Sequence, residues 1–213
     1  LTEGTFSPST TGETFPITMI SNVNLIGQGE EITILNAELS GGVITMEFCN
    51  HNTISDLTIT GGLAEGEYPD NRGGGMYLGD SNPTFNNVTI SNNMSDDHGG
   101  GMYLDDSNPT FNNVTISNNT SDNQGGGMKL YYSNPILTDV TIANNTAYNG
   151  GGMRIEYSNP TLNNVIIANN TANWGGGMNL YNSNPILNDV TISNNTAEED
   201  GGGMFLAFSN PNL

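Results

Sequence analysis

Aromatic, acidic and basic side chains recur at three neighbouring positions of a repeated sequence, and together they could recognise a sugar. The first position is held in turn by Tyr77, Tyr103, Lys129, Arg154, Asn179 and Phe205. Aromatic rings suit the apolar C–H surfaces of sugars. The sequence therefore predicts a shallow ligand-binding strip that consists of Tyr77, Tyr103, Tyr131, Tyr132, Tyr157 and Tyr181.

The repeat that positions these residues has three constant parts. Gly-Gly-Gly-Met recurs in steps of 26, 26, 25, 25 and 26 residues, with its methionine at 76, 102, 128, 153, 178 and 204. Ser-Asn-Pro keeps the same steps, and an Asn-Asn pair lies between them. All the length variation falls between Asn-Asn and the triple glycine, which predicts a surface loop there.

Within one repeat the apolar residues alternate with period two, as in β-strands. Met102 and Leu104 flank Tyr103, and Val114 and Ile116 flank Thr115. We expect three short strands per coil, with stacked inward columns of Met, Leu, Phe or Leu, Val and Ile. Parallel crossovers are right-handed. The predicted fold is thus all-β, a single right-handed parallel β-helix of 25–26 residues per coil.

Other residues of the repeat fit the corners of such a coil. Glycine accepts the positive φ of a tight corner, and stacked asparagines can hydrogen-bond along the axis as a ladder. Residues 1–72 are expected to form irregular coils of the same solenoid. Residues 73–213 form the regular repeats, of which the last is incomplete.

The composition excludes several classes of partner. A net charge of -19, from 3 Lys+Arg and 22 Asp+Glu, repels phosphate backbones and anionic headgroups. We therefore expect neither nucleic-acid binding nor membrane insertion. Cys49 is the only cysteine, so no disulfide within the chain is possible.

The chain resembles secreted bacterial and archaeal proteins of the pectate-lyase-like β-helix superfamily. The resemblance rests on Gly4–Pro8, on Val23–Gly29 and on the Gly-Gly-Gly-Met and Asn-Asn-Val-Thr-Ile-Ser repeats, and covers essentially the whole chain. It implies the fold and an extracellular location. Since the superfamily contains lyases, hydrolases, adhesins and structural proteins, it does not imply one activity.

The resemblance also suggests where catalysis would occur. In members that cleave acidic polysaccharides, aspartates on the equivalent strand face hold calcium and a basic residue takes a proton from the sugar. The residues of this chain in that place are Lys129, Arg154, Asp105, Asp106 and Glu156. The alternative is that the two basic residues relieve carboxylate repulsion on a solvated face.

Carboxylates in the variable segment offer a second place for calcium. Asp96, Asp97 and Asp122 lie there, and calcium is bound by six to eight oxygen ligands. The alternative is surface charge that keeps the protein soluble. The sequence requires no cofactor, and Ca²⁺ is the one candidate.

These observations favour an extracellular structural or adhesive solenoid over an enzyme. It would act as a stalk, filament or surface component, bind polysaccharide through the aromatic strip and self-associate head to tail. The second hypothesis is a calcium-dependent lyase or hydrolase of acidic polysaccharide. The third is ice binding by outward Thr and Ser pairs such as Thr115 and Ser117, an array that Ile166 interrupts.

Overall fold

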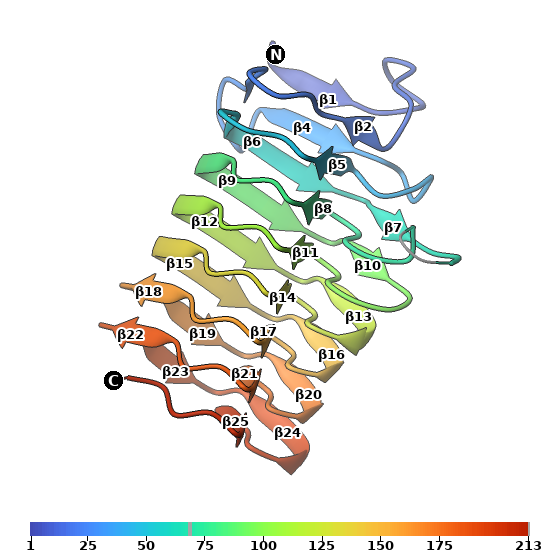
Figure 1. Ribbon diagram of the computed structural model, residues 1–213. Coiled ribbons are helices and arrows are strands. Elements are labelled where there is room, and N and C mark those ends of the chain that lie inside the picture. The colour runs from blue at the N-terminus through green and yellow to red at the C-terminus, as the bar shows by residue number, and fades with distance from the viewer. Residues whose placement is uncertain (68–69, 213) are drawn as a thin grey trace.

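The protein is a β-helical rod in which three parallel sheets run along the axis (Figure 1). The computed structural model describes residues 1–67 and 70–212. The two termini lie near opposite ends of the rod. Among the described residues, no helix is long and apolar enough to cross a membrane.

Three sets of strands make up the rod. Sheet A contains β1 (Gly4–Phe6), β3 (Leu25–Ile26), β4 (Thr33–Asn36), β6 (Thr53–Thr60), β9 (Thr84–Ser91), β12 (Thr110–Ser117), β15 (Ile136–Ala143), β18 (Thr161–Asn163), β19 (Ile166–Ala168), β22 (Ile186–Asn188) and β23 (Thr191–Ser193). Sheet B contains β2 (Ile17–Thr18), β5 (Ile44–Glu47), β8 (Met76–Gly79), β11 (Met102–Asp105), β14 (Met128–Tyr131), β17 (Met153–Glu156), β21 (Met178–Tyr181) and β25 (Met204–Ala207). Sheet C contains β7 (Leu63–Ala64), β10 (Met94–Ser95), β13 (Thr120–Gln124), β16 (Thr146–Asn149), β20 (Thr171–Trp174) and β24 (Thr196–Asp200).

Residues one repeat apart lie directly above one another, as the sequence predicts. Met102 pairs with Met76 on one side and Met128 on the other, and all three are fully buried. Phe85 and Phe111 stack in the core with ring centroids 4.7 Å apart. The apolar columns therefore form one thin continuous core, which no single coil could bury alone.

The predicted asparagine ladder is also present. Asn119 is fully buried, its Nδ2 donates to the Oδ1 of Asn145 at 3.1 Å, and its Oδ1 accepts from the Nδ2 of Asn93 at 3.0 Å. Asn145, Asn170 and Asn195 continue the ladder. Each side chain also donates to a core-strand carbonyl, as Asn119 does to Ile90 at 3.0 Å. The ladder thus satisfies polar groups at a buried corner.

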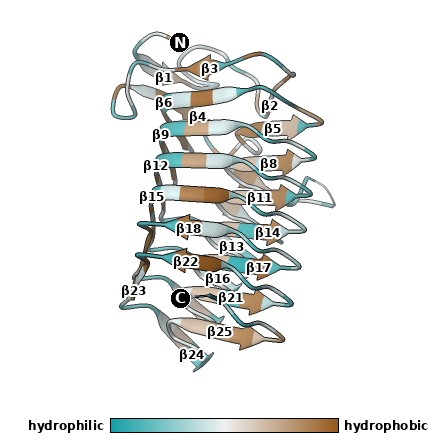
Figure 2. Cartoon of the chain, turned by 60° about the vertical axis from the view of Figure 1, so that its left-hand side comes forward, coloured by the Kyte–Doolittle hydropathy of each residue, from teal (hydrophilic) through white to brown (hydrophobic). Residues whose placement is uncertain are grey.

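The assignment of the three strands within a coil was partly wrong. In the coil of β12 the segments around Phe111 and Val114 form one eight-residue strand, which bends at Asn113 where φ is +52°. In later coils the same two segments are separate strands, β18 and β19 and then β22 and β23. Figure 2 shows these sheet A strands stacked one above another. The third strand of the coil lies instead in the segment predicted as a loop, where β13 faces the core with Ser121 alone. One small inward residue gives no hydrophobic periodicity to detect.

Glycine is required at the corner between sheets C and B. Gly99 has φ of +68°, and a Cβ atom there would lie 2.3 Å from the carbonyl oxygen of Met102. At Gly100 a Cβ would lie 2.2 Å from the carbonyl oxygen of Thr120. The corner therefore brings the end of sheet C close to the strand that carries the predicted site.

Candidate functional site

The outward column of sheet B runs along the whole rod. Strand register places its members one above another in the order Thr18, Thr45, Tyr77, Tyr103, Lys129, Arg154, Asn179 and Phe205. Most of this column is covered, however. Tyr103 is 2% exposed and Lys129 is 1% exposed. The expectation that positions varying between repeats face solvent is therefore wrong for this column.

A second column covers the first. Its members are the residues that immediately precede each triple glycine, namely Arg72, His98, Gln124, Asn149, Trp174 and Asp200. No prediction from the sequence concerns this column as a whole. Its constant offset from the triple glycine is the signal that could have identified it.

Side chains of the two columns contact each other in several coils. The Nζ of Lys129 donates to the Oε1 of Gln124 at 2.6 Å, and the Nδ2 of Asn179 donates to the carbonyl oxygen of Trp174 at 3.1 Å. Trp174 also packs edge-on against Phe205 with centroids 5.5 Å apart. Variation between repeats therefore reflects complementary contacts between two facing columns.

The two basic residues of the predicted lyase site are held by one carboxylate. The Nζ of Lys129 lies 2.6 Å from the Oε2 of Glu156, and the Nε of Arg154 donates to Oε1 of the same side chain at 2.9 Å. Arg154 also donates to Asn179. A lysine so enclosed has no access to a sugar carbon, since proton transfer requires hydrogen-bond reach.

Burial shifts the pKa values of Lys129 and Glu156. It lowers the pKa of the Lys129 ammonium to about 8, although the Glu156 carboxylate opposes the shift. Burial also raises the pKa of the Glu156 carboxyl, but the attraction of Lys129 and Arg154 outweighs it, so that pKa lies below its usual value. The pair is charged at neutral pH, as a structural ion pair is.

The remaining basic residue, Arg72, lies on the same side of the rod. Its Nε lies 3.4 Å from the Oδ2 of Asp97, and its Nη1 donates to the hydroxyl of Tyr103 at 3.1 Å. His98 stacks on Tyr103, and burial lowers the pKa of its imidazole. Arg72, Lys129 and Arg154 are all the Lys and Arg of the chain, and each contacts a carboxylate.

The predicted aromatic strip is divided by burial. Tyr77 and Tyr103 stack 5.8 Å apart and are only 8% and 2% exposed, so they do not form an open strip with the other four tyrosines, although Tyr77 lines a groove on the same sheet. The other four tyrosines and Phe208 form a continuous cluster at the edge of sheet B, which we call the aromatic corner: Tyr131, Tyr132, Tyr157, Tyr181 and Phe208.

The aromatic corner is exposed and preorganised. The rings of Tyr132 and Tyr157 stack 5.0 Å apart with an interplanar angle of 13°, and their residues are 46% and 39% exposed. Their backbones have φ of +46° and +50°, in the left-handed region that is unfavourable for bulky residues. Asn182 occupies the same position one coil further on, at φ of +47°. Aromatic side chains are thus present where asparagine would be less strained, which points to a function for the rings.

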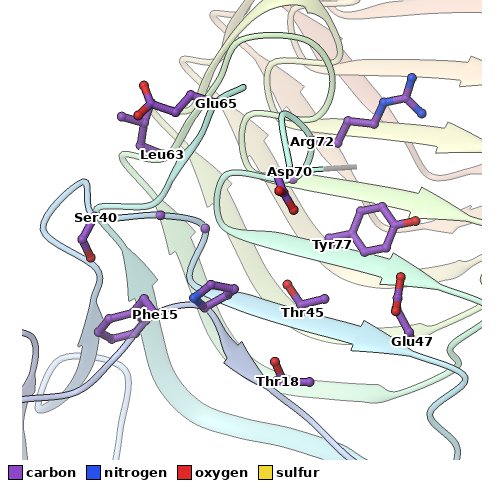
Figure 3. Close-up of a pocket in the computed structure, with 14 residues that line it drawn as sticks. Phe15, Thr18, Ser40, Thr45, Glu47, Leu63, Glu65, Asp70, Arg72 and Tyr77 are labelled. Carbon is purple, nitrogen blue, oxygen red and sulfur yellow. The ribbon is translucent and has the colours of Figure 1, made fainter. Parts of the chain in front are cut away.

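A groove that the sequence analysis missed lies on sheet B near the N-terminal end. It encloses about 470 Å³, and its floor includes Thr18, Thr45 and Tyr77, beside the carboxylates of Glu47 and Asp70 (Figure 3). We call it the head groove. Its other walls come from the irregular N-terminal coils and the segment before Arg72, whose sequences do not repeat. The repeats therefore contain no signal that predicts this groove.

The carboxylates predicted to bind calcium include Asp96 and Asp122, which follow the paired residues Ser95 and Ser121 of neighbouring coils. Asp97 contacts Arg72, and Asp96 and Asp122 are exposed. Asp105 and Asp106 line a separate pocket of about 210 Å³ with Glu47 and Asp80, where burial and the charge of Asp106 raise the pKa of Asp105. Across residues 1–67 and 70–212, no three His, Cys, Asp or Glu side chains have the arrangement of a metal site.

The outward threonines of sheet A form the expected column. Thr89, Thr115 and Thr141 are adjacent in register, and Ile166 follows them with 45% exposure. The hydroxyl of Thr89 donates to Glu30 at 3.2 Å. Ice binding by this face remains a prediction.

Comparison with known proteins agrees with the architecture. The model of a family described as right-handed beta helix region matches residues 18–213. Neither a curated protein nor a solved structure matches the chain. The matched region covers the regular coils and most of the irregular ones, and the chain therefore belongs to the right-handed β-helix family.

Proposed function

We propose that this chain is a non-catalytic extracellular β-solenoid, structural or adhesive, that binds polysaccharide through the aromatic corner. The observation that carries the proposal is the stacked, exposed pair of Tyr132 and Tyr157, held in an unfavourable backbone conformation. Rings preorganised in this way lose little conformational entropy when a sugar packs on them. The rod supplies a rigid support for the platform.

The geometry gives less support to the alternative, a calcium-dependent lyase or hydrolase of acidic polysaccharide. Lys129 would have to act as the base, yet its ammonium is enclosed by Glu156 and Gln124. Arg154 is engaged by the same carboxylate. A structural role for this ion pair accounts for all of these contacts.

Retention on immobilised polysaccharides tests the proposal. The variant Tyr132→Asn/Tyr157→Asn removes both rings while keeping the left-handed backbone, because Asn182 already occupies the equivalent position. The matched control is Tyr148→Asn, which removes a tyrosine of 50% exposure from sheet C.

We expect the wild-type protein and the control to be retained by at least one uncharged or charged polysaccharide of a broad panel. Each ring is worth about 1 kcal/mol, so the double variant should bind about tenfold or more weakly. Circular dichroism would verify that all three proteins are folded. Equal retention of the double variant, or no retention of the wild-type protein by any polysaccharide, would contradict the proposal.

A further inference from the structure

The aromatic corner is continuous with two cavities on the same sheet. Tyr131 pairs in register with Asp105, which lines the 210 Å³ pocket together with Glu47 and Tyr77. Glu47 and Tyr77 also line the head groove. The corner, the pocket and the groove therefore form one track along sheet B, from the coil of Phe208 to that of Thr18.

The N-terminal half of the track is rich in groups that accept hydrogen bonds from sugar hydroxyls. Figure 3 shows the hydroxyls of Thr18 and Thr45 and the carboxylate of Asp70 directed toward the space of the head groove. Glu47 continues the row on sheet B, and Phe15 supplies an apolar wall. Carboxylates, hydroxyls and apolar surface are the combination that holds a polyhydroxylated ring.

The charge of these cavities selects against an acidic ligand. Glu47, Asp80, Asp105 and Asp106 surround the pocket, and the head groove adds Asp70. The one basic residue that lines the head groove, Arg72, already lies against Asp97. A uronate polymer in the track would place its carboxylates beside those of the protein, in a molecule of net charge -19.

The spacing of the track also restricts the ligand. One row of the aromatic corner, Tyr132 and Tyr157, belongs to a column of left-handed residues that also contains Phe48, Asp80 and Asp106. Successive members are one coil apart, a rise of about 4.8 Å. A sugar ring in an extended chain advances by a similar distance, so each coil can contact one ring.

From this continuity, lining and spacing we infer that the ligand is an uncharged, extended polysaccharide that lies parallel to the rod axis. Some of its sugar rings pack on the tyrosines of the aromatic corner. The hydroxyls of its other sugars donate to the carboxylates of the pocket and head groove. The inference rests on the proposed function and adds the class of polysaccharide and its course. It assigns Glu47 and Asp70 as residues that recognise hydroxyl groups.

Calorimetry with size-defined oligosaccharides tests the inference. The uncharged probes are β-1,4-linked gluco-, xylo- and manno-oligosaccharides of two to eight residues, and the charged probes are oligogalacturonates and chitosan oligosaccharides. The variants are Glu47→Gln and Asp70→Asn, both at exposed positions, with Glu31→Gln as an exposed control outside both cavities.

We expect affinity for an uncharged series to increase with length up to about eight residues, one for each strand of sheet B. Glu47→Gln and Asp70→Asn should weaken binding of the longest oligomers severalfold and leave disaccharide binding and the control unchanged. Oligogalacturonates should bind at least tenfold more weakly, and binding of the uncharged series should not depend on salt.

Three results would overturn the inference. A plateau at two or three residues with no effect of Glu47→Gln would confine the ligand to the aromatic corner, and the proposed function would stand. Tighter binding of oligogalacturonates, or salt-sensitive tighter binding of chitosan oligosaccharides, would assign a charged ligand. If no oligomer binds and the double tyrosine variant changes no retention, the proposed function fails as well.

Discussion

Lys129 shows how a single residue of the repeat can be mistaken for a catalytic one. Its position beside Arg154 and two aspartates fits a base, but the residue is 1% exposed and its ammonium is bonded to Glu156 and Gln124. Removing an ammonium group from water costs more free energy than one ion pair returns, unless its other N–H groups are also hydrogen-bonded. The contacts of Lys129 with Glu156 and Gln124 therefore compensate for much of the cost of its burial, and its Nζ also lies 6.0 Å from the centroid of the Tyr131 ring.

The lowered pKa of Lys129 predicts how stability changes with pH. Its pKa is about 8 in the folded protein and about 10.4 in the unfolded chain, so the unfolded chain binds more protons between these values. The free energy of unfolding should therefore increase from pH 8 to pH 10 relative to that of Lys129→Met, by on the order of 2 kcal/mol. Denaturant titrations of both proteins would measure this. A constant difference between them across this range would contradict the assignment.

The buried hydroxyl of Ser95 leads us to expect that its removal stabilises the protein. Its residue is 4% exposed and its Oγ has no hydrogen-bond partner, whereas the Oγ of Ser121, one coil further on, donates to the carbonyl oxygen of Asp97 at 2.8 Å. Ser95→Ala should raise the free energy of unfolding by about 1 kcal/mol, and Ser121→Ala should lower it by about 1 kcal/mol. Thermal or denaturant unfolding of both variants would test the contrast, and a loss of stability in Ser95→Ala would refute it.

At the scale of elements, the corners hold the coils in register. The strands of sheets A and C meet at an Asn-Asn pair in which the first residue is exposed at positive φ and the second enters the buried ladder. Asn118 and Asn119 are one such pair. The ladder links each coil to the next by side-chain and backbone bonds, since the backbone N–H of Asn119 also donates to the Oδ1 of Asn145 at 2.9 Å.

The two members of this pair should respond differently to substitution. Asn119→Ala leaves buried donors of Asn93 without an acceptor and should cost about 3 kcal/mol. Asn118→Ala removes only an exposed side chain at φ of +57° and should cost about 1 kcal/mol. Unfolding curves of the two variants would compare them directly. Equal costs would mean that the ladder contributes nothing specific.

The sequence predicted the elements that have a repeated apolar signal and missed those that lack one. The Met, Leu and Val columns and the asparagine ladder follow from identical residues at identical offsets. Sheet C was missed because its inward positions are small, as at Ser121 and Ala147. Alternation identifies an outward side chain but not whether another segment covers it, so Tyr103 and Lys129 were placed in solvent. The head groove depends on non-repeating coils.

At the scale of the whole molecule, charge is distributed asymmetrically. All 3 Lys and Arg residues are on the covered side of sheet B, while 22 Asp and Glu are spread over the rod. The folded state brings these carboxylates closer together than the unfolded chain does. Self-repulsion therefore opposes folding more than the few ion pairs support it.

Added salt should consequently stabilise the protein. Raising NaCl from 10 mM to 500 mM at neutral pH screens the repulsion and should increase Tm by a few degrees. Scanning calorimetry would measure the change, with KCl at the same ionic strength to separate screening from a specific effect of sodium. A fall in Tm would show that the ion pairs around Glu156 outweigh the repulsion.

The most direct test of the account is a footprint of bound polysaccharide on three tyrosines. Tyr132, Tyr157 and Tyr148 are 46%, 39% and 50% exposed, so hydroxyl radicals should oxidise all three in the free protein. With saturating polysaccharide, mass spectrometry should show reduced oxidation of Tyr132 and Tyr157 and unchanged oxidation of Tyr148. Unchanged oxidation of Tyr132 and Tyr157, or equal protection of all three, would contradict binding at the aromatic corner.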